Sequence, residues 1–222
     1  MPGTQVAPSM STPHVPTLFK TGFWICTVIA VAVVIRRLVA LAFPASPPSP
    51  LANLDAMFAG HAGLTLAHII PALLFVLAAP VVLLARRPTR QSIERVFFPL
   101  GLVVGLTAYV MSSYSIGGWT ERSAVLVFNS LFLYSLARAW QFRSSGDEAR
   151  KKRWLLRSIA VLLGIATTRP VMGVFFATSR LTHLRPDQFF GVAFWIGFSI
   201  NVVLFESWLR LSDRRIASPK AV

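Results

Sequence analysis

The chain has 222 residues, of which 55% are hydrophobic and only 14% are charged, so its composition indicates an integral membrane protein rather than a soluble domain. Its formal net charge is +14, but the basic residues occur in short segments between apolar runs. That distribution is typical of membrane loops and gives no reason to expect nucleic acid as a partner. The single cysteine, Cys26, excludes an intrachain disulfide, and no cysteine or histidine spacing typical of a zinc site occurs.

The chain begins with a segment, residues 1–17, that holds four prolines and small polar residues and that predicts a disordered tail. A hydrocarbon core of about 30 Å needs about 20 apolar residues in a helix. Residues 18–211 contain six apolar runs of this kind, so we predict an all-α, polytopic bundle followed by a basic tail at 212–222. The predicted spans are 18–43, 58–85, 97–115, 123–142, 154–178 and 189–211.

The basic residues are distributed unevenly over the two sides of such a bundle. Thirteen fall on the side of the two termini, namely Arg86, Arg87, Arg90, Arg95, Arg143, Arg150, Lys151, Lys152, Arg153, Arg210, Arg214, Arg215 and Lys220. The loops on the other side contain three, which are Arg122, Arg180 and Arg185. Because cytoplasmic loops are enriched in arginine and lysine, we expect both termini in the cytoplasm and the bundle in a bacterial inner membrane.

Two arginines, Arg36 and Arg37, interrupt the first predicted span. Each would cost about 2.5–3.5 kcal/mol at mid-depth on insertion scales. We therefore favour a helix that ends near Ile35, with both side chains reaching the outer headgroups. A position of the two arginines inside the span is the alternative.

Polar side chains inside the other spans are the candidate functional residues, because lipid-facing positions disfavour them. His68 and Arg169 lie at similar predicted depths, about 15 and 14 Å from the outer ends of their helices, with Asn201 slightly deeper. Arg157 and Glu206 lie near the inner ends of the fifth and sixth spans. We predict a structural ion pair between these last two residues.

The second span contains two histidines, His61 and His68, which are seven residues apart. In a continuous helix they would differ by only about 20° around the axis. Pro71 follows His68 and Pro170 follows Arg169, and each proline frees a helical carbonyl that needs a donor. We predict a half-buried pocket of His61, His68, Arg169 and Asn201 that binds a small polar or anionic ligand. The alternative is that these residues only join helices to one another.

Several of these residues also carry a resemblance to a known family. His68-Ile69, Arg153-Trp154 with Arg157-Ser158, Arg169, and Asn201 with Glu206 resemble, in order and spacing, the motifs of bacterial predicted membrane proteins with domain of unknown function 2306. The resemblance covers about residues 58 to 210 and implies a helical membrane protein without assigning an activity. The chain departs from it at IERVFF, where the family often has a His-Arg pair, and at Lys151 and Lys152, where it has a histidine.

Three classes of function remain open from the sequence: ligand binding or transport, a structural or assembly subunit, and a membrane redox protein with quinone or haem. A bis-histidine haem needs imidazoles from facing helices, whereas the only other histidine beyond the tail is His183, in a predicted outer loop. No GxSxG, HExxH, P-loop or GxGxxG motif occurs in a suitable context. The sequence therefore assigns no catalytic residue, metal, cofactor or oligomeric state, and it leaves enzymatic activity open.

Overall fold

The computed structural model describes residues 17–43 and 52–217, and within these ranges every regular element is a helix. Eight helices follow one another along these ranges: α1 (Thr17–Ala42), α2 (Ala52–Gly60), α3 (Ala62–Leu84), α4 (Arg87–Ser112), α5 (Gly118–Ser144), α6 (Glu148–Leu162), α7 (Gly164–Thr182) and α8 (Pro186–Ala217). Six apolar stretches are long enough to cross a membrane: α1, α3, α4, α5, the α6–α7 pair and most of α8. The prediction of an all-α bundle with six spans is confirmed.

Two of the predicted spans are each divided between two helices. The run 58–85 contains the end of α2 and all of α3, because His61 lies between them with φ −125° and ψ 41°. The prediction that His61 and His68 share one continuous helix is therefore wrong, since α3 begins only at Ala62. The run 154–178 is similarly divided at Leu163, which separates α6 from α7.

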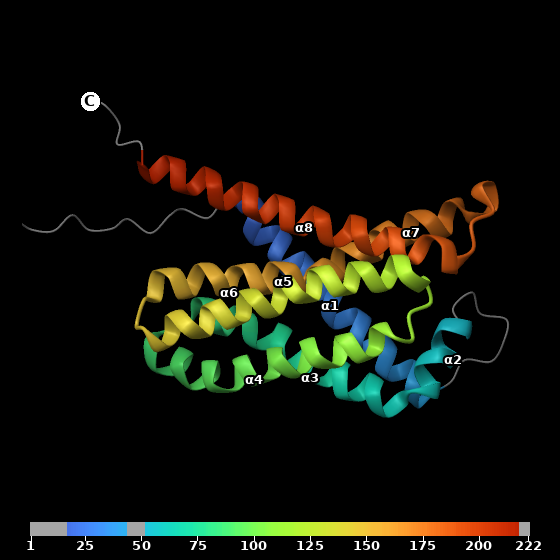
Figure 1. Ribbon diagram of the computed structural model, residues 1–222, viewed down its shortest axis with the longest axis horizontal. Coiled ribbons are helices and arrows are strands. Elements are labelled where there is room, and N and C mark those ends of the chain that lie inside the picture. The colour runs from blue at the N-terminus through green and yellow to red at the C-terminus, as the bar shows by residue number, and fades with distance from the viewer. Residues whose placement is uncertain (1–16, 44–51, 218–222) are drawn as a thin grey trace, which may run out of the picture.

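Both ends of the described chain lie at the same end of the bundle (Figure 1). The ring of Phe19 in α1 lies 5.3 Å from that of Trp208 in α8, measured between centroids. The α3–α4 and α5–α6 connections, with their arginines and lysines, lie at this end too, which we call the basic end. The opposite end, which carries α2, is the α2 end. The side of the membrane that each end faces stays a prediction.

The predicted tails lie partly outside the described residues. Residues 1–16 and 218–222 are not among them, so the predicted N-terminal tail is not tested. Helix α8 continues to Ala217, beyond the predicted end of the bundle at residue 211.

The centre of the bundle is a group of stacked aromatic rings from three helices. Phe75 of α3 and Phe97 of α4 stack with centroids 4.0 Å apart, and Phe132 of α5 meets Phe75 edge-on at 5.6 Å. All three side chains are fully buried. Because lipid tails are as apolar as these side chains, close packing rather than hydrophobic transfer holds membrane helices together. This group fixes α3, α4 and α5 relative to one another.

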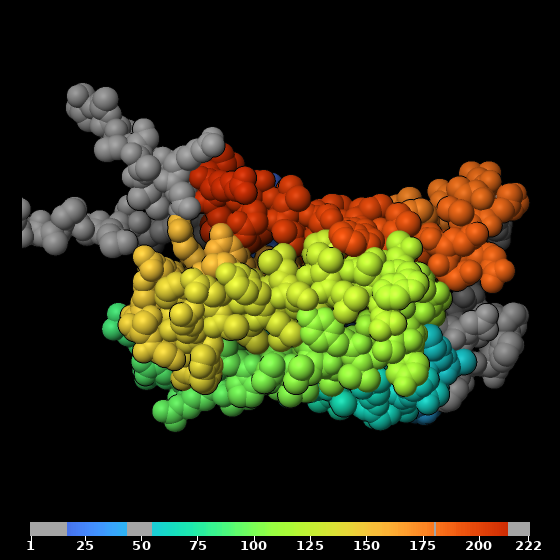
Figure 2. All heavy atoms as spheres, viewed as in Figure 1, coloured from blue at the N-terminus to red at the C-terminus, as the bar shows by residue number. Residues whose placement is uncertain are grey.

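The outer surface of the long helices is apolar. Side chains near the middle of different spans, such as Val28, Leu77, Leu106 and Val203, are at least half exposed. Figure 2 shows α4, α5 and α6 packed side by side over one face, with α8 along its edge. A protein in water would bury such residues, so this surface contacts the lipid bilayer.

Helix α1 crosses the bundle obliquely and packs against α2, α3 and α7 (Figure 1). It continues through both of its arginines to Ala42, so the favoured prediction of a helix that ends near Ile35 is wrong. The reason is a carboxylate from the next helix, Asp55 of α2. Because α2 folds back beside the end of α1, it supplies the counter-ion that the lipid cannot.

The contacts of Asp55 show how the two arginines are accommodated. Arg36 Nη2 lies 3.0 Å from Asp55 Oδ2, and Arg37 Nη1 lies 2.6 Å from Oδ1. The guanidinium of Arg37 also lies over the Phe58 ring, 3.9 Å from its centroid. Arg37 is buried, so it is neutralised inside the protein rather than at the headgroups.

Candidate ligand-binding cavity

A cavity of about 260 Å³ lies between the helices toward the α2 end. All eight helices contribute to its lining, which is mainly apolar. Three of the four residues predicted to bind a ligand line it, His61, His68 and Arg169. The structure therefore brings together side chains from α3, α7 and the α2–α3 junction.

His68 is held on the cavity wall by a threonine of the neighbouring helix. Its Nδ1 lies 2.9 Å from Oγ1 of Thr107 in α4. The Thr107 hydroxyl donates its one proton to the carbonyls of Val103 and Val104, at 2.7 and 3.1 Å, so its oxygen accepts from Nδ1. In the neutral imidazole this arrangement leaves Nε2 as a hydrogen-bond acceptor.

Arg169 is the cation on the cavity wall with the fewest protein contacts. Its Nη1 lies 3.8 Å from the sulfur of Met172, and its buried Nε has no hydrogen-bond partner. Within residues 17–43 and 52–217, no carboxylate lies at ion-pair distance from it. The charges that act on it through space are those of Arg37, Arg36 and Glu121. Its guanidinium therefore retains its capacity to donate.

The cavity is also lined by two charged residues that the sequence analysis did not select as ligand-binding residues. Glu121 in the first turn of α5 accepts a hydrogen bond from the Gly117 backbone N–H at 2.7 Å, and Arg37 comes from α1. Glu121 lies two residues before the predicted span at 123–142, and this closeness to the span was the only feature of the sequence that could have indicated a role in the cavity. Arg37 was predicted to reach the headgroups because an arginine at mid-depth is costly, and its partner Asp55 lies outside the predicted spans.

His61 lies at the mouth of the cavity. It is exposed and precedes the first residue of α3. Its ring lies 3.9 Å from that of Tyr114, measured between centroids, and its Nδ1 lies 3.3 Å from the Met57 carbonyl. A molecule that enters from the α2 end would meet His61 before His68.

Asn201, the fourth predicted ligand-binding residue, does not line this cavity. It connects α8 to the junction of α6 and α7 instead. Its Oδ1 accepts from the Thr167 hydroxyl at 2.6 Å, and its Nδ2 donates to the Ala160 carbonyl at 3.2 Å. Because Thr167 stands two residues before Arg169, these bonds fix the segment of α7 that carries the arginine.

Arg157 and Glu206, predicted to form an ion pair, lie in contact near the basic end. Arg157 Nε donates to Oε1 of Glu206 at 2.6 Å, and Nη2 donates to Oε2 at 3.1 Å. The arginine also lies over the ring of Trp154, 4.6 Å from its centroid. About 27% and 33% of the two side chains are exposed, so the pair is only partly shielded.

We expect Arg157 and Glu206 to be energetically coupled. Glu206→Gln and Arg157→Gln should each lower the free energy of unfolding in detergent, because each leaves the other charge without its partner. The double variant should be more stable than the sum of the two losses predicts, with a coupling of about 1 kcal/mol. The same cycle between Glu206 and the exposed Arg95 of α4 is the control and should be additive. Additivity in both cycles would contradict the prediction.

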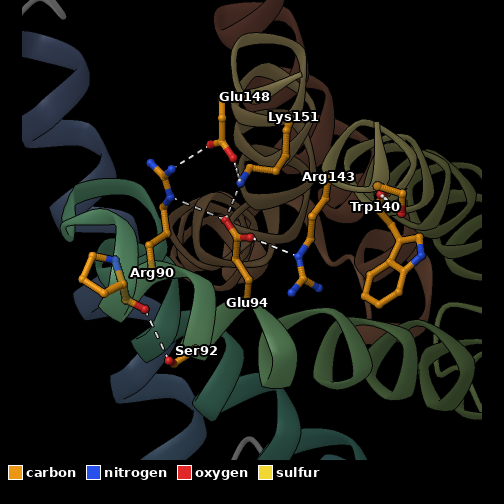
Figure 3. A network of polar contacts seen from close by, with 9 residues as sticks. Arg90, Ser92, Glu94, Trp140, Arg143, Glu148 and Lys151 are labelled. Atoms are coloured by element: carbon orange, nitrogen blue, oxygen red, sulfur yellow. Dashed lines mark hydrogen bonds and ion pairs between the residues drawn. The ribbon is translucent and has the colours of Figure 1, made fainter. Parts of the chain in front are cut away.

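The most buried charges form a second network, at the basic end, which sequence reasoning missed. Glu94 of α4 has no exposed surface and lies 2.8 Å from Nζ of Lys151, which is also buried (Figure 3). Arg143 and Arg90 approach the same carboxylate, at 3.3 and 3.7 Å. Lys151 and Arg90 also contact Glu148, at 2.9 and 2.7 Å. Only the placement of Glu94 at membrane depth was a signal, because two of its three partners, Arg143 and Lys151, come from other helices.

Neither the cavity nor the charged network at the basic end resembles a metal centre. Within residues 17–43 and 52–217, no group of three or more histidine, cysteine or acidic side chains is placed to hold a metal ion. The charged side chains that line the cavity are two arginines and one carboxylate, and this excess of positive charge favours an anionic ligand over a cation.

The chain matches a family model described as "Predicted membrane protein (DUF2306)" over residues 65–209. The match begins within α3, includes α4 to α7 and ends within α8, so it contains His68, Arg169 and the basic-end network. No curated protein and no solved structure matches the chain. The chain therefore belongs to the DUF2306 family of predicted membrane proteins.

Proposed function

We propose that this membrane protein binds a small molecule with an anionic or strongly polar group in the cavity at the α2 end. The observation that carries the proposal is Arg169, a guanidinium at the cavity wall with an unpartnered Nε and no carboxylate at ion-pair distance among the described residues. A charge inside a membrane protein faces protein or a cavity and marks ligand or ion pathways. An anion would supply the partner that the helices do not.

The neighbouring side chains support an acidic group as the part of the ligand that Arg169 binds. A guanidinium can donate two parallel hydrogen bonds to a carboxylate or a phosphate. Arg37 adds positive charge, although Asp55 neutralises part of it. Glu121 is the carboxylate of the lining, and it accepts from a backbone N–H rather than from Arg169. His68 Nε2 can accept a hydrogen bond from a hydroxyl of the same ligand.

The rest of the cavity defines the other part of the ligand. Toward the middle of the bundle its walls are apolar, with Val76, Phe128, Phe132 and Phe198 among the lining residues. An apolar wall with a few polar groups at one end is typical of sites for molecules of mixed character. The ligand class that fits is a short amphiphilic carboxylate or phosphate, with its charged group at Arg169.

The test compares three probes with the same six-carbon chain: hexanoate, hexyl phosphate and the uncharged hexan-1-ol. A ligand that binds only the folded state raises the free energy of unfolding, by about 2.7 kcal/mol at 100 times its dissociation constant. In detergent, an acidic probe should raise the unfolding temperature of the wild type more than hexan-1-ol does. If neither acidic probe exceeds hexan-1-ol, the proposal is wrong.

Three variants assign the effect to the site. Arg169→Met should remove the response to the acidic probes, and Arg169→Lys should keep part of it, because lysine retains the charge without the planar fork. His68→Phe should reduce the response to hexan-1-ol, because the hydroxyl of this probe can donate to Nε2. If the variants lose stability while the wild type shows no response to any probe, these residues join helices and an assembly subunit becomes the better account.

A further inference from the structure

A second cavity, of about 250 Å³, is lined by residues of the basic end, whereas the first lies toward the α2 end. It lies where the end of α3, the start of α4 and the start of α6 meet. Its charged lining consists of Arg87, Arg90, Lys151, Lys152, Glu94 and Glu148. Its apolar lining includes Val82, Leu83 and Leu155.

The charges of this cavity do not balance. Its lining holds four basic side chains and two carboxylates. Both carboxylates are already engaged, because Glu94 and Glu148 each contact Arg90 and Lys151 (Figure 3). An excess of two positive charges therefore remains in the lining, and Arg143 adds a third on the far side of Glu94.

Arg87 and Lys152 carry this excess. Both side chains are exposed, and neither forms a hydrogen bond or ion pair with another residue of the described ranges. The buried ion pair of Glu94 and Lys151 links α4 to α6 through its side chains, and these are the helices that carry Arg87 and Lys152. The two exposed cations therefore lie on helices that this buried ion pair connects.

We propose that this cavity binds a phosphate group, supplied by the headgroup of an anionic membrane lipid. Arginine and lysine are the side chains that bind phosphate, and basic pockets between membrane helices bind the headgroups of anionic lipids. The position supports a lipid over a free anion, because the floor of the cavity is apolar and Leu84 beside it is exposed. A lipid can place its phosphate on the cations and its glycerol and chains on this apolar surface.

The test uses bilayer nanodiscs of phosphatidylcholine that contain a minor fraction of phosphatidylglycerol. Native mass spectrometry of the protein released from them counts the lipids that stay bound. The wild type should retain phosphatidylglycerol in preference to phosphatidylcholine. Arg87→Gln/Lys152→Gln should weaken that retention about 10- to 30-fold, the effect ordinarily expected for two basic residues near an anionic surface.

Arg86→Gln/Arg95→Gln is the matched control. It removes the same charge from two exposed arginines near the cavity that do not line it, and it should leave retention unchanged. Equal losses in the two double variants, or no preference for phosphatidylglycerol in the wild type, would overturn the proposal. Circular dichroism checks that both variants, which change only exposed residues, remain folded.

Inorganic phosphate separates the two sources of the group. In detergent without anionic lipid, it should protect the wild type against unfolding less than phosphatidylglycerol does. Equal protection by inorganic phosphate that disappears in Arg87→Gln/Lys152→Gln would support the phosphate site but contradict a lipid as its source.

Discussion

Glu94→Gln is expected to lower the free energy of unfolding in detergent by about 3–5 kcal/mol, the usual effect of removing one partner from a buried ion pair. The carboxylate has no exposed surface, and the amine of Lys151, 2.8 Å away, is 2% exposed. A glutamine keeps the size of the side chain but leaves the lysine charged and buried. Denaturation followed by tryptophan fluorescence or circular dichroism measures the loss.

Two comparisons show whether charge pairing is the cause. Asp187→Asn removes a carboxylate whose partner Arg185 is largely exposed, and we expect little change from it. Glu94→Gln combined with Lys151→Met should be more stable than Glu94→Gln alone, because the second change removes a buried charge whose only remaining carboxylate partner is the partly exposed Glu148. A double variant that is no more stable than Glu94→Gln would contradict this account of the network.

Gly197→Ala is expected to have the second large effect, because helices α7 and α8 touch at this residue. A Cβ at Gly197 would lie 2.5 Å from Oγ1 of Thr168 and 2.6 Å from its Cα and its backbone N. Backbone atoms cannot move aside as a flexible side chain can, so the helices must separate. Overpacking of this kind costs about 1–3 kcal/mol, and close contact through small residues is a common way for membrane helices to pack.

Gly173→Ala is the matched control for Gly197→Ala. Gly173 lies on α7, is exposed, and would have nothing within 4 Å of an added Cβ. Because alanine favours helix more than glycine does, this variant should be at least as stable as the wild type. Thermal unfolding in one detergent compares the two. Equal stability of both variants would mean that α7 and α8 do not touch at Gly197.

The spans could be predicted from the sequence because hydropathy and helix length follow directly from the thickness of the hydrocarbon layer. The depths of His68 and Arg169 followed from the same count, and the structure places both on one cavity. Helix breaks were not predictable in this way. A glycine stands beside each break, since Gly60 ends α2 before His61 and Gly164 begins α7 after Leu163. A single glycine weakens a helix without fixing where it ends, so the apolar runs still read as continuous.

The counter-ions were also missed, for a different physical reason. Asp55 lies outside the predicted spans, and Glu121 lies just before one, so a search for charges within spans passes over both. Their importance comes from tertiary contacts, with Arg37 in one case and with the cavity lining in the other. For Asn201 the depth in the membrane could be estimated from the sequence. The direction of its side chain could not, because it depends on how α8 packs against α7.

The two places at which the chain departs from the family pattern meet in space. Glu94 belongs to the IERVFF stretch, and Lys151 belongs to the lysine pair before Trp154. The structure joins them in one ion pair inside the basic-end network.

The most direct measurement of the central claim is mass analysis, with an ultraviolet-visible spectrum, of what remains bound after purification in mild detergent. The wild type and Arg169→Met are compared at equal folded yield. We predict an acidic small molecule in the wild type and a clear reduction of it in Arg169→Met, with no visible chromophore in either. The same bound molecules in equal amounts in both proteins would contradict a ligand held by Arg169, and a visible chromophore lost with His68→Phe would favour a redox protein.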